Sequence, residues 1–200
     1  APSRGLGDVY KRQNKNPTGR RVTTNDYSSA DYYYVNKSSL PKVYGGFNTS
    51  LSWKGFDLSA IFAYSIGGYI YNRDITMILH NGSLEGRDWS TEILRRWTPD
   101  NRYTDVPALS TTSNNWNSAS TRFLQNNSYM RLKNLTLSYN LPKQWISKLS
   151  LSSVQVYVQG DNLFTIHRNQ GLDPEQGITG ITYYRYPAMR TISGGINVSF

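Results

Sequence analysis

The sequence contains no cysteine among its 200 residues. This absence excludes disulfide bonds, thiolate metal sites and cysteine nucleophiles within these residues. No apolar run approaches the ~20 residues that a membrane-spanning helix requires. Mean hydropathy is also low, at −0.58. The low value does not exclude a β-barrel, because each spanning strand exposes only alternate side chains to lipid.

Residues suited to catalysis or metal binding are scarce. The two histidines, His80 and His167, have no Cys or His partner at the spacing of a metal site. Asp173 and Glu175 flank Pro174 and could form a carboxylate pair, but a proline-containing turn is the more ordinary interpretation. No Ser, His and Asp set is indicated by spacing. We therefore predict no catalytic residue, no metal ligand and no cofactor, and we do not expect an enzyme.

The formal net charge of +9 is unevenly distributed. Residues 1–21 hold six basic side chains and one acidic side chain, a net +5, which leaves +4 for the other 179 residues. That remainder is too weakly basic to indicate a nucleic-acid-binding surface. The basic segment also lacks the apolar stretch of a signal peptide. We expect residues 1–30 to form a leader that is disordered or, up to about residue 13, not native.

Apolar side chains recur at every second position over several segments, which indicates β-strands. The first two such segments, 42–53 and 56–66, flank Lys54-Gly55, a two-residue hairpin turn. The alternation returns over 128–141, 154–164 and 189–200. Residues 31–200 are therefore predicted to be all-β, an antiparallel meander of about five strands.

The connections between these segments alternate in length, short at 54–55 and 142–153 and long at 67–127 and 165–188. All long connections then leave one end of the sheet, as the extracellular loops of transmembrane barrels do. At the other end we expect a periplasmic girdle of interfacial aromatic side chains, formed by Trp53, Phe56, Tyr139 and Phe200. The prediction is a partial transmembrane β-barrel whose apolar face contacts outer-membrane lipid.

The last predicted strand ends on an aromatic residue. Its polar–x–Gly–x–x–apolar–x–aromatic spacing is similar to the C-terminal signal that the barrel assembly machinery reads. The residues at these positions are Ser193, Gly195, Val198 and Phe200. We expect this segment to act as an insertion signal.

Two features of the remaining sequence leave alternatives open. Aromatic side chains in the long connection can stack on sugar rings or contact a lid protein, or they can fill a small core of the connection itself. These residues are Trp89, Trp97, Tyr103 and Trp116.

Arg131 and Lys133 share the parity of Leu135, which would direct them to lipid, where a cation at the midplane costs about 2–4 kcal/mol. We therefore expect them above the membrane rim, or behind a bulge that changes the parity.

Several segments, taken together, resemble the SusC/RagA family of TonB-linked outer-membrane proteins. They occur in the family's order and lie within residues ~31–200. The segments are 40–47 (LPKVYGGF), 53–58 (WKGFDL), 128–142 (SYMRLKNLTLSYNLP), 156–165 (VYVQGDNLFT) and 171–175 (GLDPE).

The resemblance implies a barrel of about 22 strands with an N-terminal plug, of which this chain would supply the last strands without the plug. It implies import of a nutrient, commonly a glycan or oligosaccharide and sometimes a peptide, across the cell outer membrane. The implied partners are a SusD-like surface lipoprotein, which would cover the extracellular mouth, and TonB, which would act through an N-terminal region absent here.

A soluble carbohydrate-binding β-sandwich is the alternative, since such modules also expose Trp and Tyr. It predicts that the alternating apolar side chains face an internal core. The residues that distinguish the two folds are Phe47, Leu58, Phe62, Leu137 and Val156.

Overall fold

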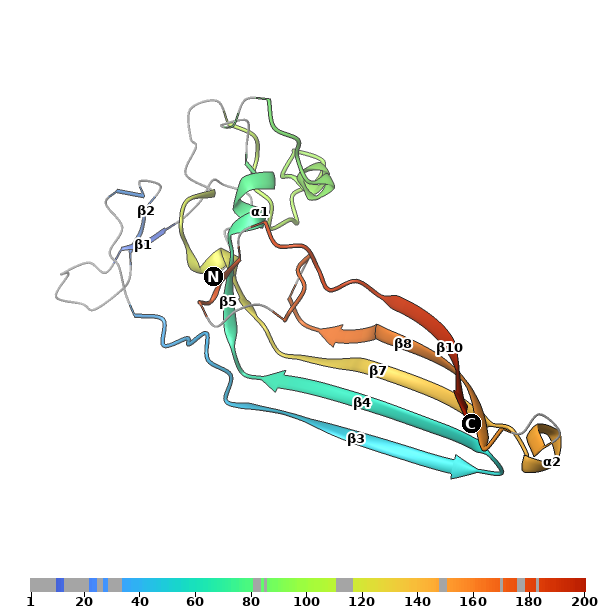
Figure 1. Cartoon of the computed structure of the whole chain (residues 1–200). Coiled ribbons are helices and arrows are strands. Elements are labelled where there is room, and N and C mark those ends of the chain that lie inside the picture. The colour runs from blue at the N-terminus through green and yellow to red at the C-terminus, as the bar shows by residue number, and fades with distance from the viewer. Residues whose placement is uncertain are drawn as a thin grey trace. The chain divides into compact units, whose positions relative to one another are not determined.

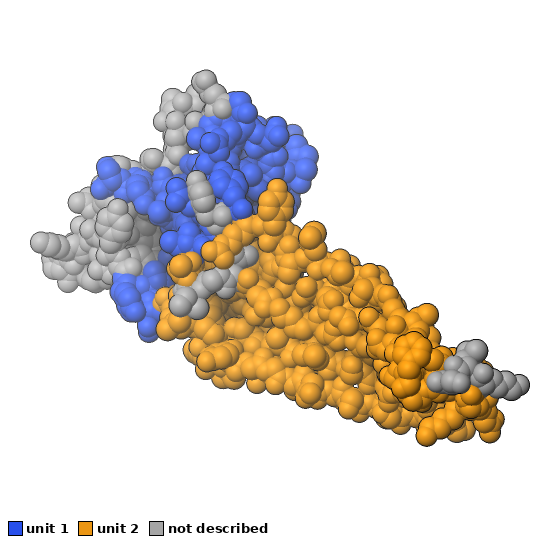
Figure 2. Space-filling model, viewed as in Figure 1, with its two compact units in different colours: residues 1–36, 71–124, 181–184 blue, residues 37–70, 125–180, 185–200 orange. Residues whose placement is uncertain are grey.

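The computed structural model describes residues 10–12, 22–24, 27–28, 34–80, 84, 86–110, 117–147, 151–169, 171–175, 179–182 and 184–200. They belong to two compact units, coloured in Figure 2. Unit 1 comprises residues 1–36, 71–124 and 181–184, and unit 2 comprises residues 37–70, 125–180 and 185–200. No helix in the described ranges is long and apolar enough to cross a membrane.

Unit 2 contains a five-stranded antiparallel sheet, whose strands lie side by side in the order in which they occur along the chain (Figure 1). The strands are β3 (Val43–Trp53), β4 (Phe56–Ile66), β7 (Tyr129–Asn140), β8 (Ser153–His167) and β10 (Thr191–Ser199). This arrangement confirms the predicted all-β meander. A short helix, α2 (Lys143–Ile146), lies in the connection from β7 to β8.

The turn from β3 to β4 has the predicted two-residue form. Lys54 and Gly55 have φ values of 47° and 88°, and positive φ at both central residues is the mark of a type I′ turn. Trp53 pairs with Phe56 across the turn. The backbone N–H of Asn140 on β7 donates to the Gly55 carbonyl at 2.8 Å, which ties the turn to the next strand.

One face of the sheet, here called the apolar face, carries exposed hydrophobic side chains in adjacent registers. Leu51, Leu58, Leu137 and Val158 follow one another across β3, β4, β7 and β8. Phe47, Leu58, Leu137 and Val156 are 50%, 40%, 42% and 42% exposed, and Phe62 is half-buried and stacks on Phe47. The sandwich alternative is therefore wrong, because it requires these side chains in an internal core.

The opposite face, here called the polar face, carries small and polar side chains that bond to one another. Asn134 donates from Nδ2 to Asp161 Oδ1 at 2.8 Å, and the Thr136 hydroxyl donates to Asn134 Oδ1 at 2.9 Å. Near the β3–β4 turn, Asn140 Nδ2 donates to Asp57 Oδ2 at 2.7 Å. The polar face thus satisfies much of its own hydrogen-bonding capacity.

A β-bulge at Lys133 changes the parity of β7. Asn134 pairs with Ile61 on β4, but the next pair is Leu132 with Phe62, so Lys133 is skipped. Lys133 is thus the one extra residue that a bulge inserts into the ladder with β4. The register with β8 shifts at the same place, but there two residues of β8, Asn162 and Leu163, are skipped opposite Lys133. Leu132 then continues the apolar face, and Arg131 turns to the polar face. Of the two placements expected for Arg131, above the membrane rim or behind a bulge that changes the parity, the structure shows the second.

Unit 1 is built from short elements and contains a small hydrophobic core. Ile93 and Val106 form this core, with Leu79 packed against them. The elements with residues in unit 1 are β1 (Tyr10–Arg12), β2 (Val22–Thr24), β5 (Tyr69–Asn72), α1 (Arg73–Ile78), η1 (Thr91–Arg95), η3 (Thr121–Phe123), β6 (Leu124–Asn126) and β9 (Ile181–Thr182). Within the expected leader, β1 and β2 pair antiparallel.

Candidate functional site

A buried ionic cluster lies on the polar face of unit 2, at the end from which the long connections leave. Arg131 on β7 donates from Nη2 to Asp173 Oδ1 at 2.5 Å, and these two side chains are only 4% and 5% exposed. Its Nη1 donates to Glu175 Oε2 at 2.8 Å, and its Nε donates to the Thr165 hydroxyl at 2.9 Å. Lys133 in the bulge also pairs with Glu175.

Asp173 is held by backbone as well as by Arg131. Its Oδ1 accepts from the N–H of Glu175 at 2.9 Å, and its Oδ2 accepts from the N–H of Ala188 at 2.6 Å. Burial by itself would raise the pKa of Asp173, but the hydrogen bonds from Ala188, Glu175 and Arg131, together with the Arg131 charge, hold that pKa below its ordinary value. The segment around Pro174 is thus a turn, as expected, and it is fastened to β7.

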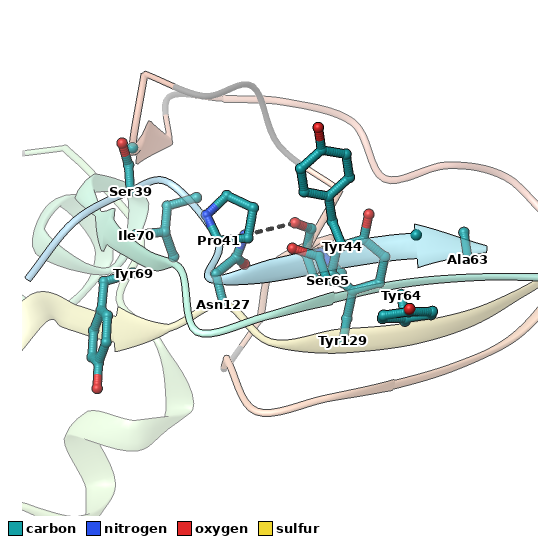
Figure 3. Close-up of a pocket in the computed structure, with 13 residues that line it drawn as sticks. Ser39, Pro41, Tyr44, Ala63, Tyr64, Ser65, Tyr69, Ile70, Asn127 and Tyr129 are labelled. Carbon is teal, nitrogen blue, oxygen red and sulfur yellow. Dashed lines mark hydrogen bonds between the residues drawn. The ribbon is translucent and has the colours of Figure 1, made fainter.

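A cavity of about 350 Å³ lies beside this cluster, and every residue that lines it belongs to unit 2 (Figure 3). It lies where β4 carries the small residues Ala63 and Ser65. Ser65 pairs with Tyr44 on β3 and with Tyr129 on β7, so two tyrosines flank one small side chain on the polar face. Pro174 and Gly180, from the connection between β8 and β10, complete the lining.

Asn127 fastens that connection to the sheet. Its Nδ2 donates to the Pro174 carbonyl at 2.8 Å, the dashed line in Figure 3. Its Oδ1 accepts from Asn169 Nδ2 at 2.8 Å, and its backbone N–H donates to the Gly68 carbonyl at 2.8 Å. The cavity wall is therefore held by three hydrogen bonds of one residue, two from its side chain and one from its backbone.

The aromatic residues predicted to contact a ligand or lid lie in different environments. Trp89 donates from Nε1 to His80 Nδ1 at 3.0 Å. Trp97 is half-buried, whereas Tyr103 is 93% exposed. None of these three belongs to the Ile93–Val106 core, and Trp116 lies outside the described residues. Their predicted contact with a ligand or lid stays a prediction.

The aromatic residues of the expected periplasmic girdle gather at the end of the sheet with the short connections. Trp53 pairs with Phe56, and Phe56 pairs with Tyr139, whose ring centroid lies 4.5 Å from that of Phe56. Phe200 follows β10 at the same end and is exposed. Phe200 accepts a hydrogen bond at its carbonyl from the Ser152 hydroxyl at 3.3 Å. Contact of this group with lipid stays a prediction.

The residues of the expected insertion signal all lie on β10 or directly after it. Ser193 pairs with Gln159, Gly195 with Tyr157 and Val198 with Val154 on β8. The alternation places Ser193 and Gly195 on the polar face and Val198 on the apolar face. Recognition by the assembly machinery stays a prediction.

No family model matches the sequence, but individual proteins do. The chain is 34% identical over 166 residues to TonB-dependent receptor P3 of Formosa agariphila, which covers 78% of this chain and 16% of that protein. It is 27% identical to TonB-dependent receptor SusC of Bacteroides thetaiotaomicron, over 84% of this chain and 16% of SusC. The chain belongs to the SusC/RagA family.

Solved structures support this membership. The RagAB peptide importer in its "closed-closed" state matches with a TM-score of 0.83 and 33% identity, over 98% of this chain and 21% of the matched chain. Its "open-open" state matches with a TM-score of 0.80. The chain thus spans about a fifth or less of the relatives that it matches. These relatives are receptors and importers and not enzymes, and this SusC/RagA chain is an outer-membrane protein.

Sequence reasoning missed both the cavity and the ionic cluster. Arg131 and the Asp173–Glu175 pair were each noted, but 42 residues separate Arg131 from Asp173, and the bulge conceals the parity of Arg131. The sequence did contain a usable signal for the ionic cluster. Arg131 was expected to avoid lipid, and a buried cation needs a carboxylate near it, such as Asp173 or Glu175. Tyr44, Ser65 and Tyr129 carried no such signal, because only the strand register brings them together.

Proposed function

We propose that this chain forms part of the barrel wall and of the extracellular mouth of a TonB-dependent outer-membrane importer. The imported nutrient is a glycan or oligosaccharide, or a peptide. The observation that carries this proposal is the two-faced sheet in a chain related to TonB-dependent receptors. Its apolar face remains exposed, as a lipid-facing wall requires, while its polar face forms a hydrogen-bonded surface suited to a hydrated lumen.

In this proposal residues 31–200 belong to the barrel, and the short connections face the periplasm. Trp53, Phe56, Tyr139 and Phe200 then lie at the periplasmic interface, where aromatic side chains are favoured. The ends of the strands that carry the long connections, with the ionic cluster, face the cell exterior.

The proposed partners act at opposite ends of the barrel. A SusD-like lipoprotein covers the extracellular mouth, where it meets the connection that carries Trp89, Trp97, Tyr103 and Trp116. The barrel assembly machinery reads Ser193, Gly195, Val198 and Phe200 during insertion. TonB acts on the plug of the complete receptor. Support for these partners comes from the relatives and from the exposure of Tyr103 and Phe200.

Expression of the full gene product tests the proposal. We expect the protein in the outer-membrane fraction and uptake of an oligosaccharide or peptide that stops when TonB is deleted. Expression with an intact TonB in the same strain is the control. Recovery as a soluble monomer, or uptake that continues without TonB, would contradict the proposal.

A further inference from the structure

We propose that the cavity between Tyr44 and Tyr129 is a binding site for one neutral, hydroxyl-rich ring, that is, a sugar residue. This inference rests on the proposed importer function, because it assigns a ligand class and a location to the polar face of the barrel. Neither the relatives nor the sequence patterns pointed to these residues.

The shape of the cavity follows from the strand register. Tyr44, Ser65 and Tyr129 are aligned across β3, β4 and β7, and neighbouring strands lie about 4.8 Å apart. The two tyrosines therefore rise from strands about 9.6 Å apart, with one small serine between them. Figure 3 shows both rings on the same side of the sheet. The volume of about 350 Å³ lies within the ~300–1,000 Å³ range of small-molecule sites.

The wall opposite the sheet is fixed by direct contacts. Asn127 bonds to the Pro174 carbonyl, and the Arg131–Asp173 pair fastens the residue before Pro174 to β7. Gly180 has φ of 73°, and a Cβ placed on it would lie 2.5 Å from the Ser39 Cβ. This close approach requires glycine. The cavity is thus formed before any ligand arrives, which lowers the ordering cost of binding.

The lining chemistry favours an uncharged ligand rich in hydroxyl groups. Four tyrosines, two serines and one asparagine line the cavity, and no charged side chain does. Of the described charged groups next to the lining, Arg131, Asp173 and Glu175 pair with one another, and Lys37 donates from Nζ to the Tyr69 hydroxyl at 3.1 Å. A charged ligand would lose its hydration and would gain a counter-ion only by breaking one of these contacts. A sugar ring can instead place an apolar face on tyrosine and exchange hydrogen bonds with tyrosine and serine hydroxyls.

The backbone arrangement disfavours a peptide in this cavity. Extended peptides commonly bind by adding a strand to a free sheet edge. The floor of the cavity is β4, whose backbone already pairs with β3 on one side and β7 on the other. The floor of the cavity therefore offers side chains to a ligand and no free strand edge.

Binding to the full-length receptor in detergent tests the inference. The probes are maltohexaose, xylohexaose and a linear fructan, with a tryptic casein digest as the peptide probe, each measured by isothermal titration calorimetry. Tyr44→Ala removes one wall with little disturbance of packing, since Tyr44 is 78% exposed. Ser65→Trp fills the cavity. Tyr186→Ala is the matched control, because Tyr186 is exposed in unit 2 and does not line the cavity.

We expect at least one oligosaccharide to bind, with the dissociation constant raised tenfold or more by Tyr44→Ala and by Ser65→Trp and less than twofold by Tyr186→Ala. Equal affinity in all variants, binding of no oligosaccharide, or peptide binding that depends on Tyr44 would each overturn the inference. Uptake of the same probes separates the two proposals. TonB-dependent uptake with unchanged oligosaccharide affinity in the cavity variants would remove the sugar site and leave the importer function intact.

Discussion

The ring of Tyr157 on β8 lies over Gly195, its partner on β10. A Cβ placed on Gly195 would lie 2.7 Å from the Tyr157 hydroxyl oxygen and 2.8 Å from its Cζ. Aromatic rings that cover a cross-strand glycine are a known device for fixing register. Packing against Tyr157 therefore requires glycine at position 195, independently of any recognition by the assembly machinery.

This contact separates the two explanations for Gly195. Gly195→Val is expected to displace Tyr157 and to cost about 1–3 kcal/mol, as overpacking usually does, which lowers the amount of receptor in the outer membrane. The added substitution Tyr157→Ala should restore that amount if packing is the cause. Immunoblots of outer-membrane fractions measure the effect. If the double variant inserts as poorly as Gly195→Val, the packing explanation fails.

The Arg131–Asp173 pair is expected to contribute strongly to stability. Arg131→Leu would leave the buried Asp173 carboxylate without its cation, and loss of one partner of a buried pair costs about 3–5 kcal/mol. The measurement is urea unfolding of the full-length receptor in detergent, followed by tryptophan fluorescence. Arg95→Leu is the control, since Arg95 pairs with Glu92 at an exposed site, where the cost should stay below ~1 kcal/mol. Equal losses in the two variants would contradict the expectation.

The lowered pKa of Asp173 predicts the direction of a pH effect. Because the pKa of Asp173 is lower in the folded protein than its ordinary value of 3.8, the carboxylate stabilises the docked segment above about pH 4, and this contribution is lost as pH falls through the folded pKa. Glu175, Lys133 and Arg131 share the cluster. Hydrogen exchange of a peptide containing Ala188, whose N–H bonds to Asp173, measures the docking after correction for intrinsic rates.

Asp173→Asn provides the control for this measurement. The amide carries no charge, so the variant should show weakened protection already at pH 7 and a smaller further loss on acidification than the wild type, since only the Glu175 carboxylate remains in the cluster. Wild-type protection that does not fall over the acid range would show that the charge of Asp173 is not what holds the segment.

We expect an arginine to have different effects on the two faces of β3. Phe47 lies on the apolar face near the middle of the strand, and a cation at the membrane midplane costs about 2–4 kcal/mol. Phe47→Arg should therefore reduce refolding of the full-length receptor into lipid vesicles, whereas Asn48→Arg, on the polar face of the same strand, should reduce it far less. Phe47→Ala corrects for the lost ring stacking on Phe62. Equal loss from the two arginines would show that lipid does not contact the apolar face.

Local sequence was sufficient to predict the strands and the turn. Side-chain direction reverses at every residue of a strand, so the alternation over 56–66 indicated both the strand and its two faces. Lys54-Gly55 likewise specified its own conformation, because the two-residue turn requires positive φ at both positions. The family resemblance rested on short segments of the same kind.

Contacts between distant residues could not be predicted in this way. The bulge at Lys133 reverses the parity of Arg131, and no local sequence pattern predicted this bulge. Asp173 and Arg131 meet only because the connection from β8 to β10 folds back onto the polar face. The cavity depends on a register that aligns Tyr44, Ser65 and Tyr129 across three strands.

The sequence by itself determined that this chain forms a two-faced antiparallel sheet with long connections at one end. That information is local, since the period of two and the turn residues act over a few positions. Only the tertiary structure decided which side chains meet on the polar face. Register, the bulge and the fold-back of one connection depend on pairing between strands, and the free energy of that pairing is shared among residues far apart in the chain.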